Sequence, residues 1–239
     1  MDYKVNFERY EIKYLLSLRQ YNRLLAVMKN HLKLDAYGKS TIINIYYDTP
    51  NGQLIRQSNE KPIYKEKLRV RSYGVANISG DVFIELKKKY NGVVYKRRMA
   101  MNYAEALKIL VNQEFSEESQ IAKEINYFFK YYKNLQPAMY LAYEREAYFG
   151  IEDEDFRMTF DHNIVYRVKD LNLSSQVYGE ALLDSETVLL EVKTALGIPD
   201  WLVSFLTEEN IYKTTFSKYG EAYKKATCLK IKGGVNHVA

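Results

Sequence analysis

The stretch KEKLRVRSY, residues 65–73, carries a cation at every second position and constrains the fold more than any other part of the sequence. Side chains two residues apart on a β-strand point to the same side, so a strand here has one basic face and one face with Leu68 and Val70. Cations about 7 Å apart repel each other by roughly 0.6 kcal/mol in water and more strongly where water is scarce. The basic face therefore requires either open solvent or a bound anion. Its four cations are Lys65, Lys67, Arg69 and Arg71.

The same alternation of charged and apolar residues recurs along the chain and predicts an antiparallel sheet of about eight strands. A sheet with one wet face explains the pattern of any single strand. It explains less well why the polar positions of five strands carry Arg, Lys and Glu instead of Ser, Thr, Asn and Gln. We favour the alternative, a closed eight-stranded antiparallel β-barrel with a polar interior. Strands are expected at residues 7–15, 40–49, 65–73, 81–90, 93–101, 139–149, 156–167 and 188–194.

Helical periodicity between these strands makes the expected fold class α+β, with helices on the periphery. Ser17 is an N-cap candidate for a helix over residues 17–34, and Pro199 precedes a helix at WLVSFL. Asn91-Gly92 is a strong signal for a hairpin turn. No repeat or linker is visible, so residues 1–239 are expected to form a single domain. Further helices are expected within residues 103–133 and at FSKYGEAYKKATCLK, and a turn or short helix at residues 51–57.

Charge balance and cysteine content narrow the class of function. The formal net charge is +5, from 35 basic and 30 acidic residues, which favours a local anion site over a surface built for nucleic acid. The single cysteine, Cys228, excludes an internal disulfide and fits a reducing compartment. With no signal peptide and no apolar membrane span readable, a cytoplasmic location is expected.

Other candidate sites carry less weight. The sequence contains neither a P-loop nor a GxGxxG motif, and the spacing of its histidines, His31, His162 and His237, is not that of metal ligands. The basic aromatic stretch KEINYFFKYYKN, residues 123–134, could contact RNA or a membrane surface. Its helical spacing favours instead a helix packed on the sheet.

If the polar faces of the strands turn inward, about ten cations share one channel, which is tolerable only with an anion inside it. Polyphosphate or a nucleoside triphosphate fits, because Arg and Lys are the usual partners of phosphate. Three glutamates project among these cations, where carboxylates can hold Mg²⁺ or Mn²⁺ against phosphate oxygens. The alternative is that each glutamate pairs with a neighbouring lysine. The three are Glu11, Glu85 and Glu191, and Glu191 has the strongest claim because it lies in an otherwise apolar strand.

Nine short motifs, in order along the chain, resemble those of a known family. They are FERYEIKYLL, YYDTP, KLRVRSY, VFIELKKK, YKRRM, YEREAY, FRMTFDHNI, LLEVK and FSKYG. As an ordered set over residues 5–228 they resemble the VTC domain, the polyphosphate-polymerase branch of the triphosphate tunnel metalloenzymes, related to the CYTH proteins. The resemblance implies an eight-stranded tunnel that binds triphosphate or polyphosphate together with a divalent metal, Mn²⁺ or Mg²⁺.

The resemblance also implies roles for individual residues. The catalytic residues it implies are Lys13, Arg69, Arg71, Arg145 and Lys218. The substrate-binding residues it implies are Arg9, Lys87, Lys96, Arg98, Arg157 and Lys193, and the metal ligands are Glu191, Glu11 and Glu85. Arg9 stands where the ExExK-type motif of the first strand has its first acid, which suits the VTC branch. Thr214 and Thr215 depart from the pattern, since VTC polymerases tend to carry a further basic residue shortly before Lys218.

The activity implied is transfer of the terminal phosphoryl group of ATP to a growing polyphosphate chain, with release of ADP. This chemistry depends on positioning and charge neutralisation, and an attacking polyphosphate end is already an oxyanion, so no general base is required. Two alternatives stay open: hydrolysis of tripolyphosphate or a nucleoside triphosphate, with water oriented through Glu11 or Glu85, and binding without turnover. No nucleic-acid partner is expected, and a membrane partner protein and the oligomeric state stay open.

Overall fold

The computed structural model describes residues 10–91, 93–195 and 197–233, with side chains to Cys228. Arg9, Gly92 and His237 lie outside the described residues. Within the described ranges, eight long strands match the number expected, and two further strands have two residues each. The strands are β1 (Tyr10–Ser17), β2 (Leu32–Asp48), β3 (Tyr64–Tyr73), β4 (Asp81–Tyr90), β5 (Val93–Asn102), β6 (Gln136–Gly150), β7 (Arg157–Arg167), β8 (Glu180–Ala181), β9 (Thr187–Thr194) and β10 (Lys213–Thr214).

These strands form one ten-stranded sheet, and every pairing whose register is known is antiparallel, which confirms the expected α+β class. The order is β10-β1-β9-β7-β6-β2-β3-β4-β5, with β8 paired to β7. Among the described residues β5 pairs with β4 alone, so the sheet is open. The expectation of a closed eight-stranded barrel is therefore not confirmed. Alternation predicts which face of a strand is polar, but it does not determine whether the two outermost strands of a sheet pair with each other.

The chain divides into two compact units, each assembled from three separate segments. Unit 1 contains the described residues up to Thr41 together with Tyr143–Ile164 and Leu183–Phe216. Unit 2 contains Ile42–Ala142, Val165–Leu182 and the described residues from Ser217. The long strands β2, β6 and β7 contribute residues to both units. The expectation of a single domain over residues 1–239 stays a prediction.

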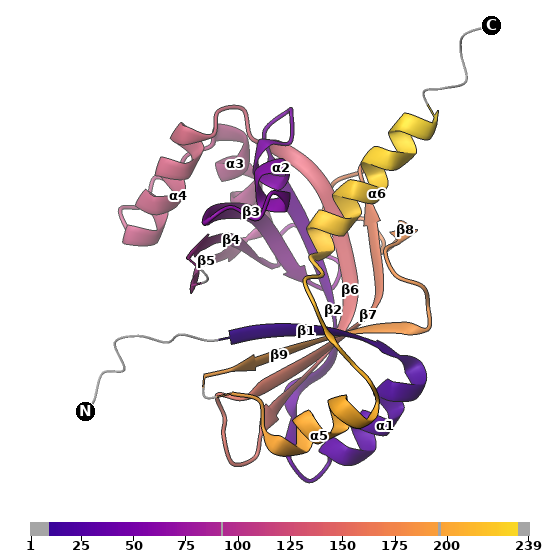
Figure 1. Ribbon diagram of the computed structural model, residues 1–239. Helices are drawn as coiled ribbons and strands as arrows, with labels where there is room; N and C mark the ends of the chain where they lie inside the picture. Colours follow the sequence, from indigo (N-terminus) through magenta and orange to yellow (C-terminus); the bar gives the residue numbers. More distant parts are fainter. Residues whose placement is uncertain (1–9, 92, 196, 234–239) are drawn as a thin grey trace, which may run out of the picture. The chain divides into compact units, whose positions relative to one another are not determined.

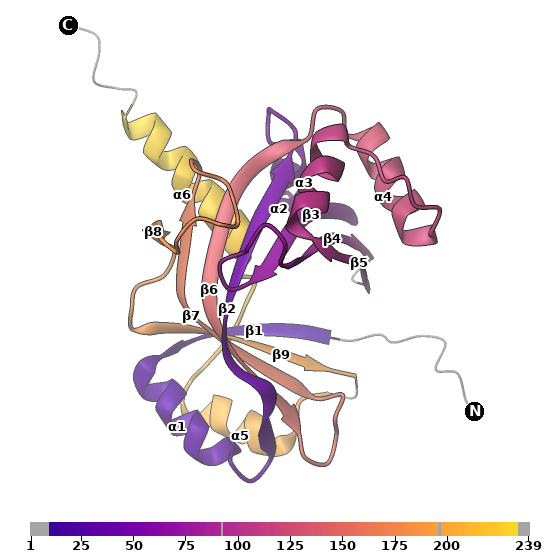
Figure 2. The ribbon, with the colours of Figure 1, turned by 180° about the vertical axis from the view of Figure 1, so that it is seen from behind.

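The core of unit 1 forms where two helices cover one face of its strands. Helices α1 (Leu18–Met28) and α5 (Asp200–Glu208) lie side by side against β1 and β9 in both views (Figures 1 and 2). Their apolar faces pack with buried residues of β1, β7 and β9 in one hydrophobic cluster. The contributing helix residues are Tyr21, Leu24, Met28, Leu202, Phe205 and Leu206.

The start of α1 is as predicted, but its end is not. Ser17 is the N-cap: its hydroxyl accepts a hydrogen bond from the Gln20 backbone N–H at 3.2 Å, and the Gln20 side chain accepts from the Ser17 N–H at 2.9 Å. The helix ends at Met28 instead of residue 34, because β2 begins at Leu32 and pairs with β6. Sheet pairing of β2 overrides the local helical pattern of residues 32–34.

Unit 2 has its own core between its strands and two helices. Helices α3 (Tyr103–Asn112) and α4 (Gln120–Tyr131) lie on one side of β3, β4 and β5 (Figure 1), and their buried residues join Leu68, Val70 and Ile84 in a second cluster. The hairpin expected at Asn91 is confirmed: Tyr90 pairs with Val93, and Asn91 has a φ of 45°. The remaining helices are α2 (Gln53–Asn59) and α6 (Lys218–Gly233).

Candidate functional site

The basic residues expected on β3, β4 and β5 lie on one face of unit 2, in rows that cross the strands. The register places Lys67 opposite Lys87, and Lys87 opposite Lys96, so three lysines form one row. Lys65 and Lys89 form the next row towards the hairpin end of β4. Neighbouring strands lie about 4.8 Å apart, so these like charges are closer together than cations along one strand. This concentration of like charges favours binding of an anion against the rows.

On the other side of the lysine row lies a row with a buried carboxylate at its centre. Glu85 is 1% exposed, and the register places Arg69 and Arg98 on either side of it. One Glu85 oxygen lies 2.8 Å and 2.7 Å from two nitrogens of Arg69, and 3.8 Å from Nε of Arg71. The other oxygen lies 2.7 Å from Nε and 2.5 Å from Nη2 of Arg98, and 2.8 Å from Nζ of Lys96. One carboxylate thus contacts four cations from two strands.

The pKa values in this cluster reflect burial and charge together. Burial raises the pKa of the Glu85 carboxyl, but the charges of Arg69, Arg71 and Lys96 outweigh burial and hold this pKa well below its usual value. Burial lowers the pKa of Lys96 to about 8, against the opposing attraction of Glu85. Glu85 is therefore charged at neutral pH, whereas Lys96 loses its proton at a pH only slightly above neutral.

The beginning of α6 places the predicted Lys218 in unit 2, at the end of a chain of aromatic contacts. The Arg69 guanidinium donates to the Tyr46 hydroxyl at 3.0 Å, and the Tyr46 ring stacks on Tyr219 with ring centroids 4.2 Å apart. The Tyr219 hydroxyl in turn donates to the buried carboxylate of Asp48 at 3.1 Å. These contacts fix the first turn of α6, in which Lys218 is buried.

Unit 1 holds a second group of predicted residues, with alternating charge. Nζ of Lys13 lies 3.4 Å from a Glu11 oxygen and 3.3 Å from a Glu191 oxygen. The other Glu191 oxygen lies 3.3 Å from Nη2 of Arg145. Arg145 also binds Asp161 through two hydrogen bonds of 2.6 Å and 2.7 Å. Burial lowers the pKa of Arg145, but the charges of Asp161, Tyr143 and Glu191 and the hydrogen bonding to Asp161 together outweigh burial and raise this pKa well above its usual value.

The register of unit 1 also brings hydroxyl groups to this site. Lys13 lies opposite Glu191 on β9 and opposite Thr214 on β10, and Glu191 lies opposite Thr159 on β7. The Thr159 hydroxyl is buried and has no hydrogen-bond partner among the described residues. It is therefore a donor that a ligand or a water molecule could satisfy. In the adjacent row, β9 carries Lys193, with Glu11 and Arg157 opposite it on β1 and β7.

The structure thus gathers the predicted site residues into two groups. Unit 1 holds Lys13, Glu11, Glu191, Arg145, Arg157 and Lys193, and unit 2 holds Arg69, Arg71, Glu85, Lys87, Lys96, Arg98 and Lys218. Sequence reasoning missed Asp161 and Thr159, although both share the strand face of Arg157 in FRMTFDHNI. The two-residue period that identified Arg157 therefore contained the signal for both. Tyr46 and Tyr219, in YYDTP and FSKYG, gave no comparable signal, because tyrosine is common throughout the chain.

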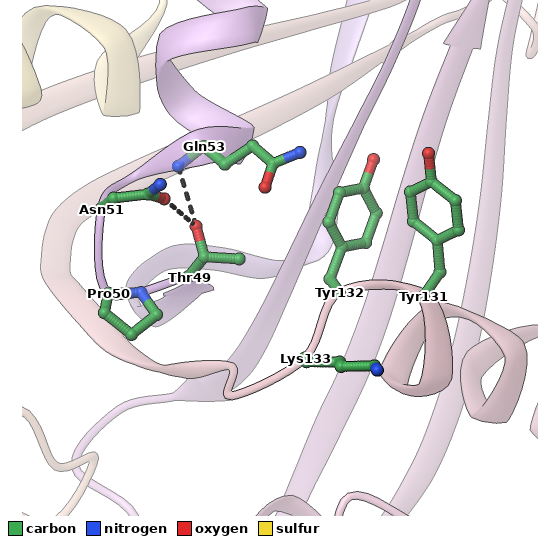
Figure 3. A pocket seen from close by; sticks show the side chains of 7 residues that line it. All are labelled: Thr49, Pro50, Asn51, Gln53, Tyr131, Tyr132 and Lys133. Atoms are coloured by element: carbon green, nitrogen blue, oxygen red, sulfur yellow. Dashed lines mark hydrogen bonds between the residues drawn. The ribbon is translucent and has the colours of Figure 1, made fainter.

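A hollow of about 420 Å³ lies elsewhere on unit 2, between the α2 turn and the end of α4 (Figure 3). Its lining contains Tyr131, Tyr132 and a single cation, Lys133. Thr49 anchors the opposite side by accepting a hydrogen bond from the Gln53 N–H at 2.9 Å. With one cation in place of a row, the hollow lacks the charge that a polyanion site needs.

Within the described residues, no helix is both long and apolar enough to cross a membrane. No group of three or more His, Cys, Asp or Glu side chains in these ranges could hold a metal ion. His31 stacks on Trp201 with ring centroids 4.7 Å apart, and His162 packs edge-on against Tyr21 at 4.9 Å.

Solved structures with a similar fold include three proteins described as adenylate cyclase candidates. One from Bacillus halodurans is 17% identical with a TM-score of 0.54, over 87% of this chain and 92% of its own. One from Vibrio parahaemolyticus is 12% identical with a TM-score of 0.50, over 89% and 96%. One from Hippeastrum, described as having a dominant triphosphatase activity, is 17% identical with a TM-score of 0.52, over 90% and 95%. At these identities the likeness shows a shared fold.

The sequence itself assigns the family. No curated protein sequence matches the chain. The family model of the VTC domain matches residues 8–227, which is nearly all of it. The chain therefore belongs to the VTC domain family, and the resemblance that the ordered motifs indicated is confirmed.

Proposed function

We propose that the protein is a polyphosphate polymerase, which transfers the terminal phosphoryl group of ATP to a growing polyphosphate chain and releases ADP. The observation that carries the proposal is the row of Lys67, Lys87 and Lys96, flanked by arginines and by further lysines. A repeated cationic array matches a repeated anion, and membership of the VTC domain family supports a polyphosphate or triphosphate substrate.

The proposed roles follow from the chemistry of phosphoryl transfer, which needs charge neutralisation and alignment more than proton transfer. The guanidinium groups of Arg69, Arg71 and Arg98 would hold phosphate oxygens, and the lysine row would hold the rest of the chain. In unit 1, Lys13 and Arg145 would contact phosphate in the same way. The remaining residues proposed to contact phosphate are Arg157 and Lys193 in unit 1 and Lys218 in unit 2.

The residues of unit 1 also fit a divalent cation. Carboxylate oxygens of Glu11 and Glu191 both lie within 3.4 Å of one atom, Lys13 Nζ, so they converge on a single point. Mg²⁺ and Mn²⁺ commonly bind through one or two carboxylates and complete their coordination with phosphate oxygens and water. We propose Glu191 and Glu11 as the residues that hold the ion, with the Thr159 hydroxyl beside them. When bound, such an ion supplies positive charge that offsets the charge of the phosphate oxygens.

The second candidate function is hydrolysis of tripolyphosphate or a nucleoside triphosphate. The triphosphatase activity described for the structurally similar Hippeastrum protein favours it, although that likeness is one of fold. Hydrolysis additionally requires an oriented water molecule, and the Glu11 carboxylate is the group in unit 1 that we propose for this role.

Incubation of the purified protein with ATP and Mn²⁺ separates these functions. Long-chain polymer and ADP are the expected products, whereas inorganic phosphate without polymer would identify a triphosphatase. Tight binding of tripolyphosphate without either product would identify a binding protein. Lys13→Ala and Glu191→Gln are expected to abolish turnover, and full activity in both variants would contradict the site assignment.

A further inference from the structure

We propose that Glu85 is the positioning residue of the basic face in unit 2 and does not bind the metal, contrary to the role that the sequence predicts for it. The inference rests on the proposed function insofar as its kinetic tests require the polymerase activity. In this assignment the carboxylate of Glu85 holds four cationic side chains in the arrangement that receives the phosphate chain. Removing it is expected to impair alignment of the substrate while leaving metal binding intact.

The first argument is that both Glu85 oxygens already have strong donors. Arg69 and Arg98 each contact one oxygen through two nitrogens, at distances from 2.5 to 2.8 Å. Lys96 adds a contact of 2.8 Å to the oxygen that Arg98 contacts. Arginine forks bind carboxylate in fixed planar geometry, so these contacts orient the guanidinium groups as well as neutralise charge.

The second argument is electrostatic. A divalent cation at Glu85 would have to displace an arginine fork and would then lie among four other cations. Each of these would repel the divalent ion with about 2 kcal/mol at 4 Å in bulk water and more strongly in a buried site. In unit 1, by contrast, two carboxylates converge on one ammonium nitrogen, Lys13 Nζ. The metal is therefore better accommodated by Glu11 and Glu191 than by Glu85.

The third argument is that Glu85 is needed for the cations to lie together at all. Its neighbours on the strand face are the lysine row on one side and Arg71, opposite Phe83, on the other. Together with the row of Lys65 and Lys89, these rows contain eight cations, and Glu85 is the one carboxylate among them. It is fully buried, so solvent contributes little to holding the four side chains that it contacts. Without it, Arg69 and Arg98 lose the partner that sets their orientation.

Glu85→Gln is the test variant, because it removes the charge and keeps the shape. Its matched control is Glu124→Gln, since Glu124 lies 3.1 Å from Arg97 Nε and 3.4 Å from Lys88 Nζ on the opposite face of β4 and β5. Glu191→Gln is the comparison for a metal ligand. The measurements are kcat and KM for ATP, the Mn²⁺ concentration at half-maximal rate, and tripolyphosphate binding in EDTA by calorimetry.

For Glu85→Gln we expect kcat to fall by about 10- to 100-fold, as for misplacement of aligned groups by about 1 Å. Tripolyphosphate binding at low salt is expected to persist, since the face gains a net positive charge. The half-maximal Mn²⁺ concentration is expected to stay unchanged, whereas Glu191→Gln raises it by about tenfold or more. Glu124→Gln is expected to match the wild type in all three.

A further measurement does not depend on activity, so it tests the role of Glu85 even if the proposed function is wrong. The Nε–H signals of Arg69 and Arg98 in a ¹⁵N-labelled protein are expected to exchange slowly with solvent, and to exchange fast in Glu85→Gln. Unchanged exchange, or an Mn²⁺ requirement raised as in Glu191→Gln, would overturn the proposal. If Glu85→Gln does not fold, Glu85→Asp takes its place, because it keeps the charge but shortens the reach and is expected to restore part of kcat.

Discussion

At the scale of single residues, each unit builds its basic side chains around a buried carboxylate. Asp161 is fully buried and binds Arg145 through both of its oxygens, as Glu85 binds Arg69 and Arg98 in unit 2. A buried carboxylate of this kind stabilises the fold only while its partner is present, because an unpaired buried charge is costly. We therefore expect the same carboxylates to stabilise the fold and to position the basic side chains of the candidate site.

Asp161→Asn is expected to lower the free energy of unfolding by about 2–4 kcal/mol, because the guanidinium of Arg145 loses its charged partner in a buried site. Urea denaturation followed by circular dichroism measures this change. Glu152→Gln, at an exposed position in the β6–β7 turn, is the control and is expected to be neutral. A loss below about 0.5 kcal/mol for Asp161→Asn, as is usual for exposed ion pairs, would show that the pair contributes little.

Lys96 gives the basic face of unit 2 a pH dependence. Its pKa of about 8 lies below the usual 10.5, so the lysine row loses a charge as the pH rises through 8. We expect tripolyphosphate affinity to fall about two- to fivefold from pH 7 to pH 9, moderated because the Lys96 side chain keeps 43% exposure. The folded state binds this proton less tightly than the unfolded state, so the same group makes stability rise between about pH 8 and 10.5.

Lys96→Arg is the control for this pH dependence, because a guanidinium stays charged across the range. Calorimetry measures tripolyphosphate binding to both proteins at pH 7, 8 and 9. The protonation state of tripolyphosphate is the same for both proteins at each pH, so a difference between their pH profiles reports Lys96. Identical pH profiles for Lys96→Arg and the wild type would assign the effect to another group.

At the scale of elements, the sequence predicted most where local and tertiary preferences agree. Alternation predicted β4 with its observed bounds, and Ser17 and Asn91 predicted a helix start and a hairpin. The predicted helix over residues 17–34 was wrong after Met28. Residues 32–34 have helical spacing but belong to β2, because β6 provides a hydrogen-bonding partner. The sequence also predicted a closed barrel where the sheet is open, because a pattern that is local to each strand does not determine whether the outermost strands pair.

The candidate site shows the same division. Strand periodicity identified the cations, because a charge at every second residue is a local signal. It could not show that Glu85 contacts four of these cations, since those contacts depend on the register between β3, β4 and β5. The role of Tyr219 depends on a contact with Asp48, 171 residues away in the chain, which no local pattern reports.

Ser17→Ala tests the capping box at the start of α1. Loss of the hydroxyl that accepts the Gln20 N–H is expected to lower the free energy of unfolding by about 1 kcal/mol. Chemical denaturation measures the loss, and Ser116→Ala, at an exposed position between α3 and α4, is the control. Equal stability of the two variants would mean that the cap is not formed in solution.

At the scale of the whole molecule, two hydrophobic cores are connected by three strands that continue from one unit into the other. Loss of either core removes packing from part of β2, β6 and β7. Because each of these strands is a single stretch of backbone, disorder in one half disturbs hydrogen bonds in the other. The two cores are therefore expected to unfold together.

The single tryptophan makes this testable, because Trp201 lies in α5 and packs in the core of unit 1. In a urea titration, Trp201 fluorescence and far-ultraviolet circular dichroism, which reports both units, are expected to give the same midpoint. Leu24→Ala, in the core of unit 1, is expected to lower both midpoints equally. Separate midpoints would mean that the units unfold independently.

The short turn after Tyr90 has a consequence beyond joining two strands. Because side chains alternate between the faces of a strand, insertion of one residue that shifts the register of β5 against β4 by one would reverse every side chain of β5. Lys96 and Arg98 would move to the face that packs on α4, and Arg97 would take their side. We therefore expect the length of this hairpin to determine which side chains line the candidate site, and a register shift caused by a change of loop length to alter specificity without replacing any of the proposed site residues.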